Sequence, residues 1–182
     1  MYGMVNAAIR GFVIKNFDEA VWTTIHTAAG SESDFLDMKS YDDDLTYNLV
    51  AAASEELNLP ADGILFSFGQ YWVSDIATAS YGELMSKTGK GFVDFVKNLD
   101  HLHERIRVNF PNYEPPSFRV KDLEDGSLQI DYYSKRIGLL PFVEGLFNGL
   151  ADHFGDSVTI EQVADDSHPM PCNRMIVTIE ER

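Results

Sequence analysis

Residues 90–110 read KGFVDFVKNLDHLHERIRVNF, and this stretch decides how the rest of the chain is interpreted. Its apolar residues recur at steps of three and four, the spacing of one helical face. They are Phe92, Phe95, Val96, Leu99, Leu102 and Ile106. His103 is in phase with this face, whereas His101 lies about 200° away around the helix axis. We therefore predict one helix that points the His103 imidazole inward and the His101 imidazole to solvent.

A single inward histidine has three interpretations. The simplest is a core histidine that is hydrogen-bonded to a backbone carbonyl. A zinc site built from His-x-His is disfavoured, because the two rings diverge on a helix and the chain has one cysteine. An axial ligand to a haem iron needs one neutral imidazole on an apolar wall. The stretch alone leaves the core histidine and the haem ligand open.

Length and charge limit the class of protein. The chain has 182 residues, of which 45% are hydrophobic and 12% aromatic, so residues 1–182 are expected to form a single domain that can enclose a flat cofactor. The formal net charge of -15 argues against a nucleic-acid-binding protein, which needs a basic face. It suits a partner with a basic patch.

Cysteine content and hydropathy indicate a cytoplasmic protein. The single cysteine, Cys172, excludes an intramolecular disulfide, fits a reducing compartment and is interpreted as a bystander rather than a nucleophile. The first residues lack a basic region and a continuous apolar run, so we expect no secretory signal. No apolar run approaches 18 residues, so we expect no transmembrane helix.

The periodicity changes once along the chain. Residues 2–86 carry helical patterns, whereas the segment PNYEPP after Phe110 cannot be helical because of its prolines. Asp125-Gly126 predicts a hairpin between two strands, and a helix over 139–154 and a second hairpin follow. The expected fold class is α+β: an N-terminal helical part followed by β-β-α-β-β with a four-stranded antiparallel sheet.

Three consecutive aspartates, Asp42, Asp43 and Asp44, precede a helical pattern. They lack the alternate-ligand spacing and turn glycine of a calcium-binding EF-hand loop. We interpret them as first-turn acids that the helix dipole stabilises.

The strand SLQIDYYSKR (127–136) ends in a row of hydrogen-bond donors. Strand alternation places Leu128, Ile130, Tyr132, Ser134 and Arg136 on one face. Tyr132 to Arg136 would span roughly 13 Å, which suits two carboxylates on one ligand. An anionic cofactor anchored here and an ordinary strand end with a solvated arginine both remain open.

The helix predicted over 139–154 has a face with two glycines. Phe142, Gly145, Leu146 and Gly149 lie at steps of three and four, so bare backbone lies beside a large ring. Glycine inside a helix costs about 1 kcal/mol relative to alanine. This face therefore indicates either a flat ligand or close packing of another helix.

Taken together, these features closely resemble the H-NOX family, the haem nitric oxide/oxygen binding domain that is also the sensor part of soluble guanylate cyclase. The resemblance covers essentially the whole chain, from MYGMVN through NLDHLHERI, EPPSF and YYSKR to the final hairpin. An in-phase histidine followed 29 residues later by Tyr-x-Ser-x-Arg is its most specific part. It favours the haem-ligand interpretation of His103.

The resemblance implies a cofactor, haem b, buried between distal and proximal parts, and a role for each matching residue. His103 matches the proximal histidine that ligates iron, and Leu99 would lie against the same haem face. Pro116 matches the proline that distorts the macrocycle. The residues that match the propionate-binding motif are Tyr132, Ser134 and Arg136. The distal wall would come from Met1, Val5, Trp72, Phe142 and Leu146.

Gas selectivity and signalling are further implications. A buried donor stabilises the charge on bound dioxygen, and oxygen-binding members use a distal tyrosine where this chain has Phe142. The expected function is therefore a sensor that binds nitric oxide and CO with oxygen excluded, unless the indole N–H of Trp72 donates instead. Release of His103 would signal to a separate protein, by family analogy a histidine kinase or a cyclic-di-GMP enzyme.

Other functions remain to be weighed. They are an oxygen-binding haem sensor, a haem enzyme such as a peroxidase, and a non-haem small-molecule binding module of the same fold. A peroxidase would need distal acid-base groups that the expected wall lacks, so we expect no enzyme activity. Some relatives carry a cysteine-rich zinc site near the C-terminus, which is not expected here with Cys172 and His168 alone. His26 and His153 receive no role.

Overall fold

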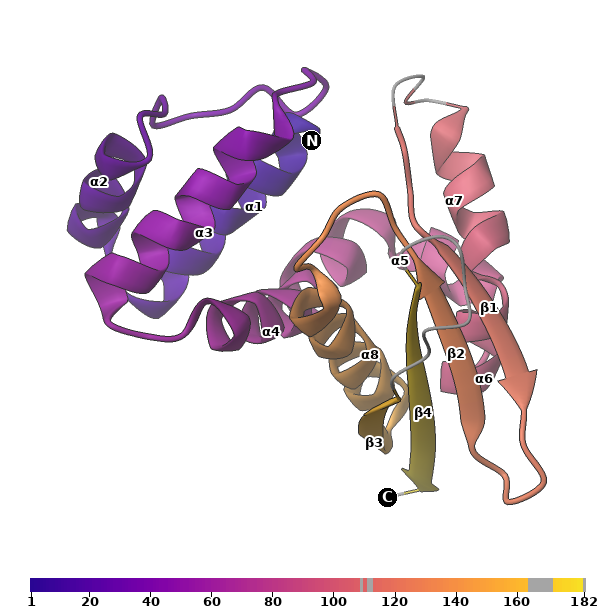
Figure 1. The fold of residues 1–182 in the computed structure, drawn as a ribbon. Helices are drawn as coiled ribbons and strands as arrows, with labels where there is room; N and C mark the ends of the chain where they lie inside the picture. The colour runs from indigo at the N-terminus through magenta and orange to yellow at the C-terminus, as the bar shows by residue number, and fades with distance from the viewer. Residues whose placement is uncertain (109, 111–112, 164–171, 182) are drawn as a thin grey trace.

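The computed structural model describes residues 1–108, 110, 113–163 and 172–181. Helices come first and a sheet follows, as Figure 1 shows. The first three helices are α1 (Gly3–Asn16), α2 (Glu19–Ala28) and α3 (Asp43–Leu57). The next are α4 (Ala61–Tyr71), a π-helix (Trp72–Ala77), α5 (Thr78–Thr88), α6 (Phe92–Lys97) and α7 (Leu99–Arg107). The C-terminal elements are β1 (Ser117–Asp122), β2 (Leu128–Tyr133), α8 (Leu140–Phe154), β3 (Asp156–Val163) and β4 (Cys172–Glu181).

The strands form one antiparallel sheet in the order β1-β2-β4-β3. The β1–β2 and β3–β4 pairs are the two predicted hairpins, with α8 between them along the chain. The predicted α+β class, with a helical part followed by β-β-α-β-β, is therefore confirmed.

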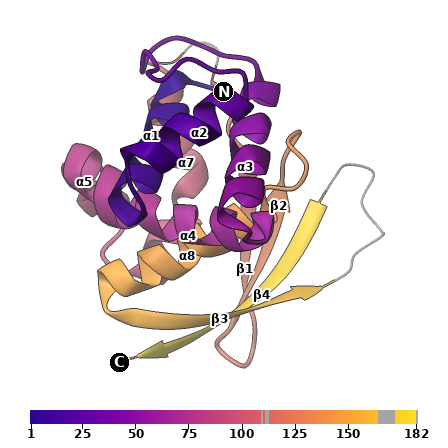
Figure 2. The same cartoon turned by 90° about the vertical axis from the view of Figure 1, so that its left-hand side faces the viewer.

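Helices α1–α3 form a unit that we call the N-terminal lobe. Its apolar core contains Trp22, Ile25 and Leu49, all fully buried. Asp18 caps α2 by accepting a hydrogen bond from the Val21 N–H at 2.8 Å. In Figure 2 this lobe lies on the far side of α4 and α8 from the β3–β4 pair.

Of the three aspartates at the start of α3, two are first-turn acids, as expected, and the other caps the helix. Asp42 is the N-cap of α3 and accepts a hydrogen bond from the Asp44 N–H at 3.0 Å. Asp43 and Asp44 lie in the first turn, where the helix dipole favours negative charge.

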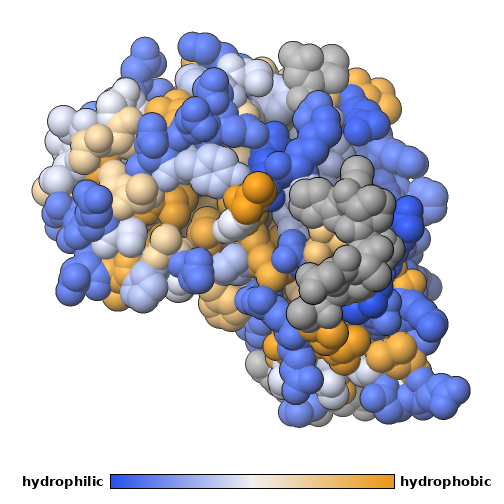
Figure 3. Space-filling model, in the orientation of Figure 1, coloured by the Kyte–Doolittle hydropathy of each residue, from blue (hydrophilic) through white to orange (hydrophobic). Residues whose placement is uncertain are grey.

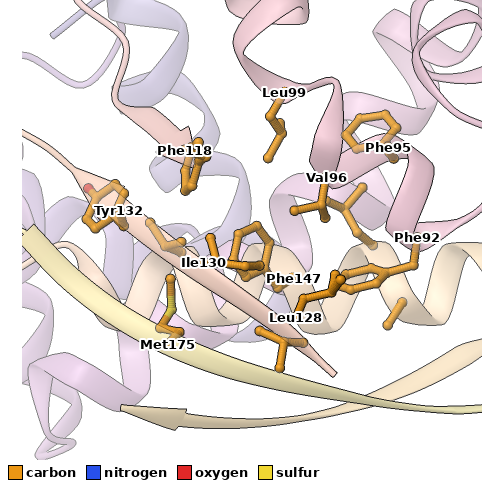
Figure 4. Packing of buried hydrophobic residues seen from close by; sticks show 14 of the residues in the cluster. Phe92, Phe95, Val96, Leu99, Phe118, Leu128, Ile130, Tyr132, Phe147 and Met175 are labelled. Atoms are coloured by element: carbon orange, nitrogen blue, oxygen red, sulfur yellow. The ribbon is translucent and has the colours of Figure 1, made fainter. Parts of the chain in front are cut away.

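The sheet, α6, α7 and α8 form a second unit, the C-terminal lobe. Leu128, Ile130 and Tyr132 alternate along β2 and are buried in its core, together with Phe147 of α8 (Figure 4). This alternation follows the prediction for one face of the strand. Hydrophilic residues are spread over both lobes on the face shown in Figure 3, in keeping with the net charge of -15.

The glycine face of α8 packs against another helix. A Cβ on Gly145 would lie 2.0 Å from the Phe66 carbonyl oxygen, and one on Gly69 would lie 2.3 Å from the Phe142 carbonyl oxygen. The backbones of α4 and α8 therefore cross in direct contact. Of the two interpretations of this face, close helix packing is confirmed.

Two local predictions were wrong. The helix predicted over residues 90–110 is divided at Asn98, whose side-chain amide donates to the Asp94 carbonyl oxygen at 2.9 Å and whose backbone leaves helical angles. Strand β2 ends at Tyr133, so Ser134 and Arg136 follow the strand instead of extending its row. In both cases a polar side chain bonds a nearby backbone group where the regular element ends. The Ser134 hydroxyl accepts a hydrogen bond from the Arg136 N–H at 3.0 Å.

Candidate functional site

His103 lies on the face of α7 that turns toward β1. Its ring is half-buried between Tyr113 and Phe118, with ring centroids 6.0 Å and 6.1 Å away. Its Nδ1 is buried and has no hydrogen-bond partner within hydrogen-bond geometry among the described residues. The His101 side chain, by contrast, is 78% exposed. The predicted division between an inward and an outward imidazole is confirmed.

The surroundings of His103 favour a neutral ring. Burial lowers its pKa below the ordinary value, while the Asp100 carboxylate and the Pro116 backbone carbonyl act in the opposite direction. Burial also raises the pKa of the neighbouring Tyr113 to about 12, so its hydroxyl stays protonated. A neutral imidazole with a buried, unpaired nitrogen is the form that binds a metal.

Asp100 is a residue of the site that the sequence did not reveal. It lies one helical turn before His103, and its carboxylate accepts hydrogen bonds from the Ser117 hydroxyl at 2.7 Å and the Phe118 N–H at 2.9 Å. Asp100 thereby ties α7 to the first residues of β1, immediately after Pro116. No local pattern signals this contact, because its partners lie 17 and 18 residues away in a different element.

The Tyr132, Ser134 and Arg136 side chains come together, although by a turn and not along a strand. Tyr132 is buried at the end of β2, where its ring stacks on Phe118 with centroids 5.3 Å apart. Burial raises the pKa of Tyr132, and a hydrogen bond with Ser134 and the charge of Arg136 oppose the rise. The turn at Ser134 brings the guanidinium of Arg136 back toward the Tyr132 hydroxyl.

The guanidinium of Arg136 is held by groups on both lobes. Its Nε and Nη2 donate to the two carboxylate oxygens of Asp43 on α3, at 2.8 Å and 3.3 Å. Its Nη1 donates to the Glu114 carbonyl oxygen at 2.8 Å. One turn further along α3, the Tyr47 hydroxyl donates to the Ile137 carbonyl oxygen at 3.0 Å. The two lobes are therefore joined beside the Tyr-x-Ser-x-Arg motif.

The residues expected in the distal wall lie in both lobes. Phe142 stacks on Phe68 with centroids 5.2 Å apart and meets Trp72 edge-on at 6.4 Å. Val5, Trp72 and Phe142 pack against the core of the N-terminal lobe, and Leu146 packs against the core of the C-terminal lobe. The amino group of Met1 donates to the Tyr41 carbonyl oxygen at 2.7 Å.

The residues expected near the His103 side are placed in the C-terminal lobe. Leu99 begins α7 and is buried in the core, where Figure 4 shows it beside Val96. Pro116 is half-buried and directly precedes β1. His168 lies outside the described residues.

A surface groove of about 620 Å³ lies elsewhere, between the ends of α1 and α8 and the π-helix. Its polar lining includes Lys15, Asp75 and His153, and it contains none of the residues expected to hold haem. We do not assign the haem site to this groove.

The side chains fit a haem group in two respects. His103 offers a buried nitrogen that has no partner among the described residues, on a ring whose pKa is lowered by burial, which favours the neutral form. Arg136 has five N–H bonds, of which three are used, so one on Nη1 and one on Nη2 have no partner among the described residues. A carboxylate of the cofactor can accept from both.

Comparison with protein families identifies the family of this chain. A family model described as Haem-NO-binding matches residues 2–162. Among the described residues, no helix combines the length and apolar content that a membrane span requires.

Curated relatives are guanylate cyclases of greater length. The chain is 24% identical to soluble guanylate cyclase gcy-31 of Caenorhabditis elegans, over 98% of this chain and 26% of that protein. It is 31% identical to soluble guanylate cyclase gcy-32 of the same organism, over 86% of this chain and 23% of that protein. The chain thus spans about a quarter of the length of these relatives.

Solved structures share the fold over its full length. An H-NOX protein from S. oneidensis in the Fe(II)NO ligation state has a TM-score of 0.86 at 20% identity and covers 100% of both chains. An unliganded Fe(II) H-NOX protein from K. algicida has a TM-score of 0.86 at 22% identity, covering 100% of this chain and 98% of that one. An H-NOX domain from Shewanella oneidensis in the Fe(II)CO state has a TM-score of 0.85 at 19% identity, with 100% of both chains covered.

Proposed function

Because this chain belongs to the Haem-NO-binding family, whose H-NOX domains bind haem and sense diatomic gases, we propose that His103 is its iron ligand and that its gases are nitric oxide and CO. Haem supplies a ferrous iron with an open position for a gas. The family match describes a sensor module related to the haem domains of soluble guanylate cyclases.

The observation that carries the proposal is the state of His103. Its ring is half-buried and lined by aromatic side chains, burial lowers its pKa, and its buried Nδ1 has no hydrogen-bond partner in the part of the chain that the structure describes. A core histidine would satisfy that nitrogen within the protein, because an unpaired buried polar atom costs about 1–3 kcal/mol. Leu99 and Pro116 lie on the same side of the site as His103 and would contact the macrocycle.

The Tyr132, Ser134 and Arg136 side chains would hold the propionates of the cofactor. Two N–H donors of Arg136 have no partner among the residues that the structure describes, and Tyr132 and Ser134 add two hydroxyls at the same turn. Hydrogen bonds to a charged group contribute about 1.5–3 kcal/mol each. These residues would fix one edge of the cofactor between the two lobes.

Exclusion of oxygen is proposed from the residue at position 142. The Phe142 ring is fixed between Phe68 and Trp72 and offers no hydrogen-bond donor. Dioxygen in such a pocket lacks the donor that would stabilise its negative outer atom, whereas nitric oxide and CO need none. Structural neighbours solved with nitric oxide and with CO support this choice of gases.

Replacement of the distal phenylalanine tests the selectivity. We expect Phe142→Tyr to raise oxygen affinity about 10- to 100-fold, because the new hydroxyl supplies one hydrogen bond to a charged atom. The measurement is the shift of the Soret band of reduced protein during oxygen titration. Phe142→Leu, which removes the ring without adding a donor, should leave the protein unresponsive to air.

The wild-type protein gives the complementary result. Reduced wild type is expected to shift its Soret band on addition of nitric oxide or CO and to show no stable oxygen spectrum in air. A stable oxygen spectrum would overturn the proposed selectivity and support an oxygen sensor. If Trp72→Phe then removed that spectrum, the indole N–H would be the donor.

The signal is proposed to pass through α7. Asp100 ties this helix to β1, and Leu99 anchors its first turn in the core. Release of the His103 imidazole would leave those attachments in place, so α7 and β1 would move together relative to the N-terminal lobe. The proposed effector is a separate histidine kinase or cyclic-di-GMP enzyme, and the net charge of -15 favours a basic surface on it.

A further inference from the structure

Asp43 stands apart from the other acidic residues at the start of α3. Asp42 caps the helix and Asp44 is exposed, whereas Asp43 is half-buried and reaches across to Arg136 in the other lobe. Its carboxylate also accepts a hydrogen bond from the amino group of Met1. Burial by itself would raise the pKa of Asp43, but the hydrogen bonds from Met1 and Arg136 outweigh it and hold the pKa below its ordinary value.

The contact between Asp43 and Arg136 fixes the plane of the guanidinium. Asp43 binds it side-on through Nε and Nη2, and the Glu114 carbonyl oxygen holds Nη1. A guanidinium held at all three nitrogens cannot rotate about its last torsion. The two unused N–H bonds, one on each terminal nitrogen, are therefore presented in a fixed direction.

We propose that Asp43 is a positioning residue for the cofactor: it orients Arg136 so that the two remaining N–H bonds receive one propionate. This inference rests on the proposed role of Arg136 in holding haem. It makes a residue of the N-terminal lobe part of the propionate site of the C-terminal lobe.

The Tyr47 contact separates orientation from lobe attachment. Tyr47 lies on the same face of α3 and also joins the lobes, but its hydroxyl binds the Ile137 carbonyl oxygen and not the guanidinium. If Asp43 acted only by holding the lobes together, loss of the Tyr47 hydroxyl would have a similar effect. If it acts by orienting Arg136, the two losses differ.

The test measures how fast haem leaves the reconstituted protein. Transfer of haem to excess apomyoglobin is followed by the Soret band for wild type, Asp43→Asn, Asp44→Asn, Tyr47→Phe and Arg136→Ala. We expect Asp43→Asn and Arg136→Ala each to speed haem loss about tenfold or more, which corresponds to loss of a charged hydrogen bond. Asp44→Asn, which removes the same charge one residue away, and Tyr47→Phe should stay within about twofold of wild type.

A double-mutant cycle adds a result that a purely structural role would not give. In the Arg136→Ala background, Asp43→Asn should change the rate of haem loss by less than about twofold, because its target is gone. Additive effects of the two substitutions would overturn the proposal. An Asp43→Asn protein that lost haem at the same rate as Asp44→Asn would also overturn it. Slower haem loss from Asp43→Asn than from wild type would overturn it too, and would mean that Asp43 competes with the propionate for Arg136.

Failure of the inference and failure of the site are distinguishable. If Arg136→Ala itself leaves haem loss unchanged, the propionate motif is misassigned. If Arg136→Ala speeds haem loss and Asp43→Asn does not, only the role of Asp43 is overturned. Should Asp43→Asn fail to fold, Asp43→Glu is the second variant, because it keeps the charge but displaces it. We expect Asp43→Glu to lose haem at a rate between those of wild type and Arg136→Ala. A wild-type rate of haem loss would overturn the role of Asp43.

Discussion

Replacement of His103 by glycine should remove the protein attachment of the haem iron. We expect His103→Gly to retain haem at least about tenfold more weakly than wild type, since even partners of a metal ligand contribute 10- to 100-fold to metal affinity. Excess imidazole should restore the pigment, because the space left by the side chain admits the free ring. The measurement is the haem content and the reduced Soret band, with and without imidazole.

His101→Gly is the matched control for this substitution. His101 lies on the same helix with its side chain exposed, so it carries the same cost of a helical glycine, about 1 kcal/mol, without contact to the site. Its pigment and spectrum should equal those of wild type. A His103→Gly protein that kept the wild-type reduced spectrum without imidazole would show that the iron ligand is a different residue.

The second large effect concerns the contact between α4 and α8. We expect Gly145→Ala to lower the free energy of unfolding by about 3 kcal/mol, at the upper end of overpacking effects. The added Cβ would lie 2.0 Å from the Phe66 carbonyl oxygen and 2.8 Å from its carbonyl carbon. These are backbone atoms of another helix, so relief requires one of the helices to move. Thermal unfolding should show a midpoint about 6–12 °C lower.

Gly63→Ala provides the opposite control. Gly63 lies on α4, the helix that Gly145 contacts, but a Cβ there would meet nothing within 4 Å. Alanine should therefore stabilise the protein by up to about 1 kcal/mol through its higher helix propensity. If Gly145→Ala were as stable as Gly63→Ala, the close contact between α4 and α8 would not be present in solution.

Much of the fold followed from local patterns. The inward direction of His103 could be predicted because three- and four-residue spacing fixes a face of a helix whatever the helix packs against. The break at Asn98 could not be predicted, because it depends on whether the Asn98 amide donates a hydrogen bond to a backbone carbonyl or to water. The strand end before Ser134 was missed for the same reason, since a serine hydroxyl bonds the backbone two residues on.

The candidate site was predictable in part. The residues expected to hold the cofactor could be named because the sequence resembles the H-NOX family, whose motif they match. The roles of Asp100 and Asp43 could not be predicted, because each of these side chains binds a group that lies far away along the chain. The glycines of α8 gave an ambiguous signal, since a bare backbone patch suits a ligand and a helix equally well.

The sequence by itself determined the α+β fold class, the inward imidazole of His103 and the absence of a donor at Phe142, because periodicity and residue chemistry are local properties. Only the tertiary structure decided which groups meet across the chain. Asp43 and Arg136 are 93 positions apart, and their contact exists because the two lobes pack together at that point. The contact between the backbones of α4 and α8 is a second feature that only packing decides, because it joins residues far apart in the sequence.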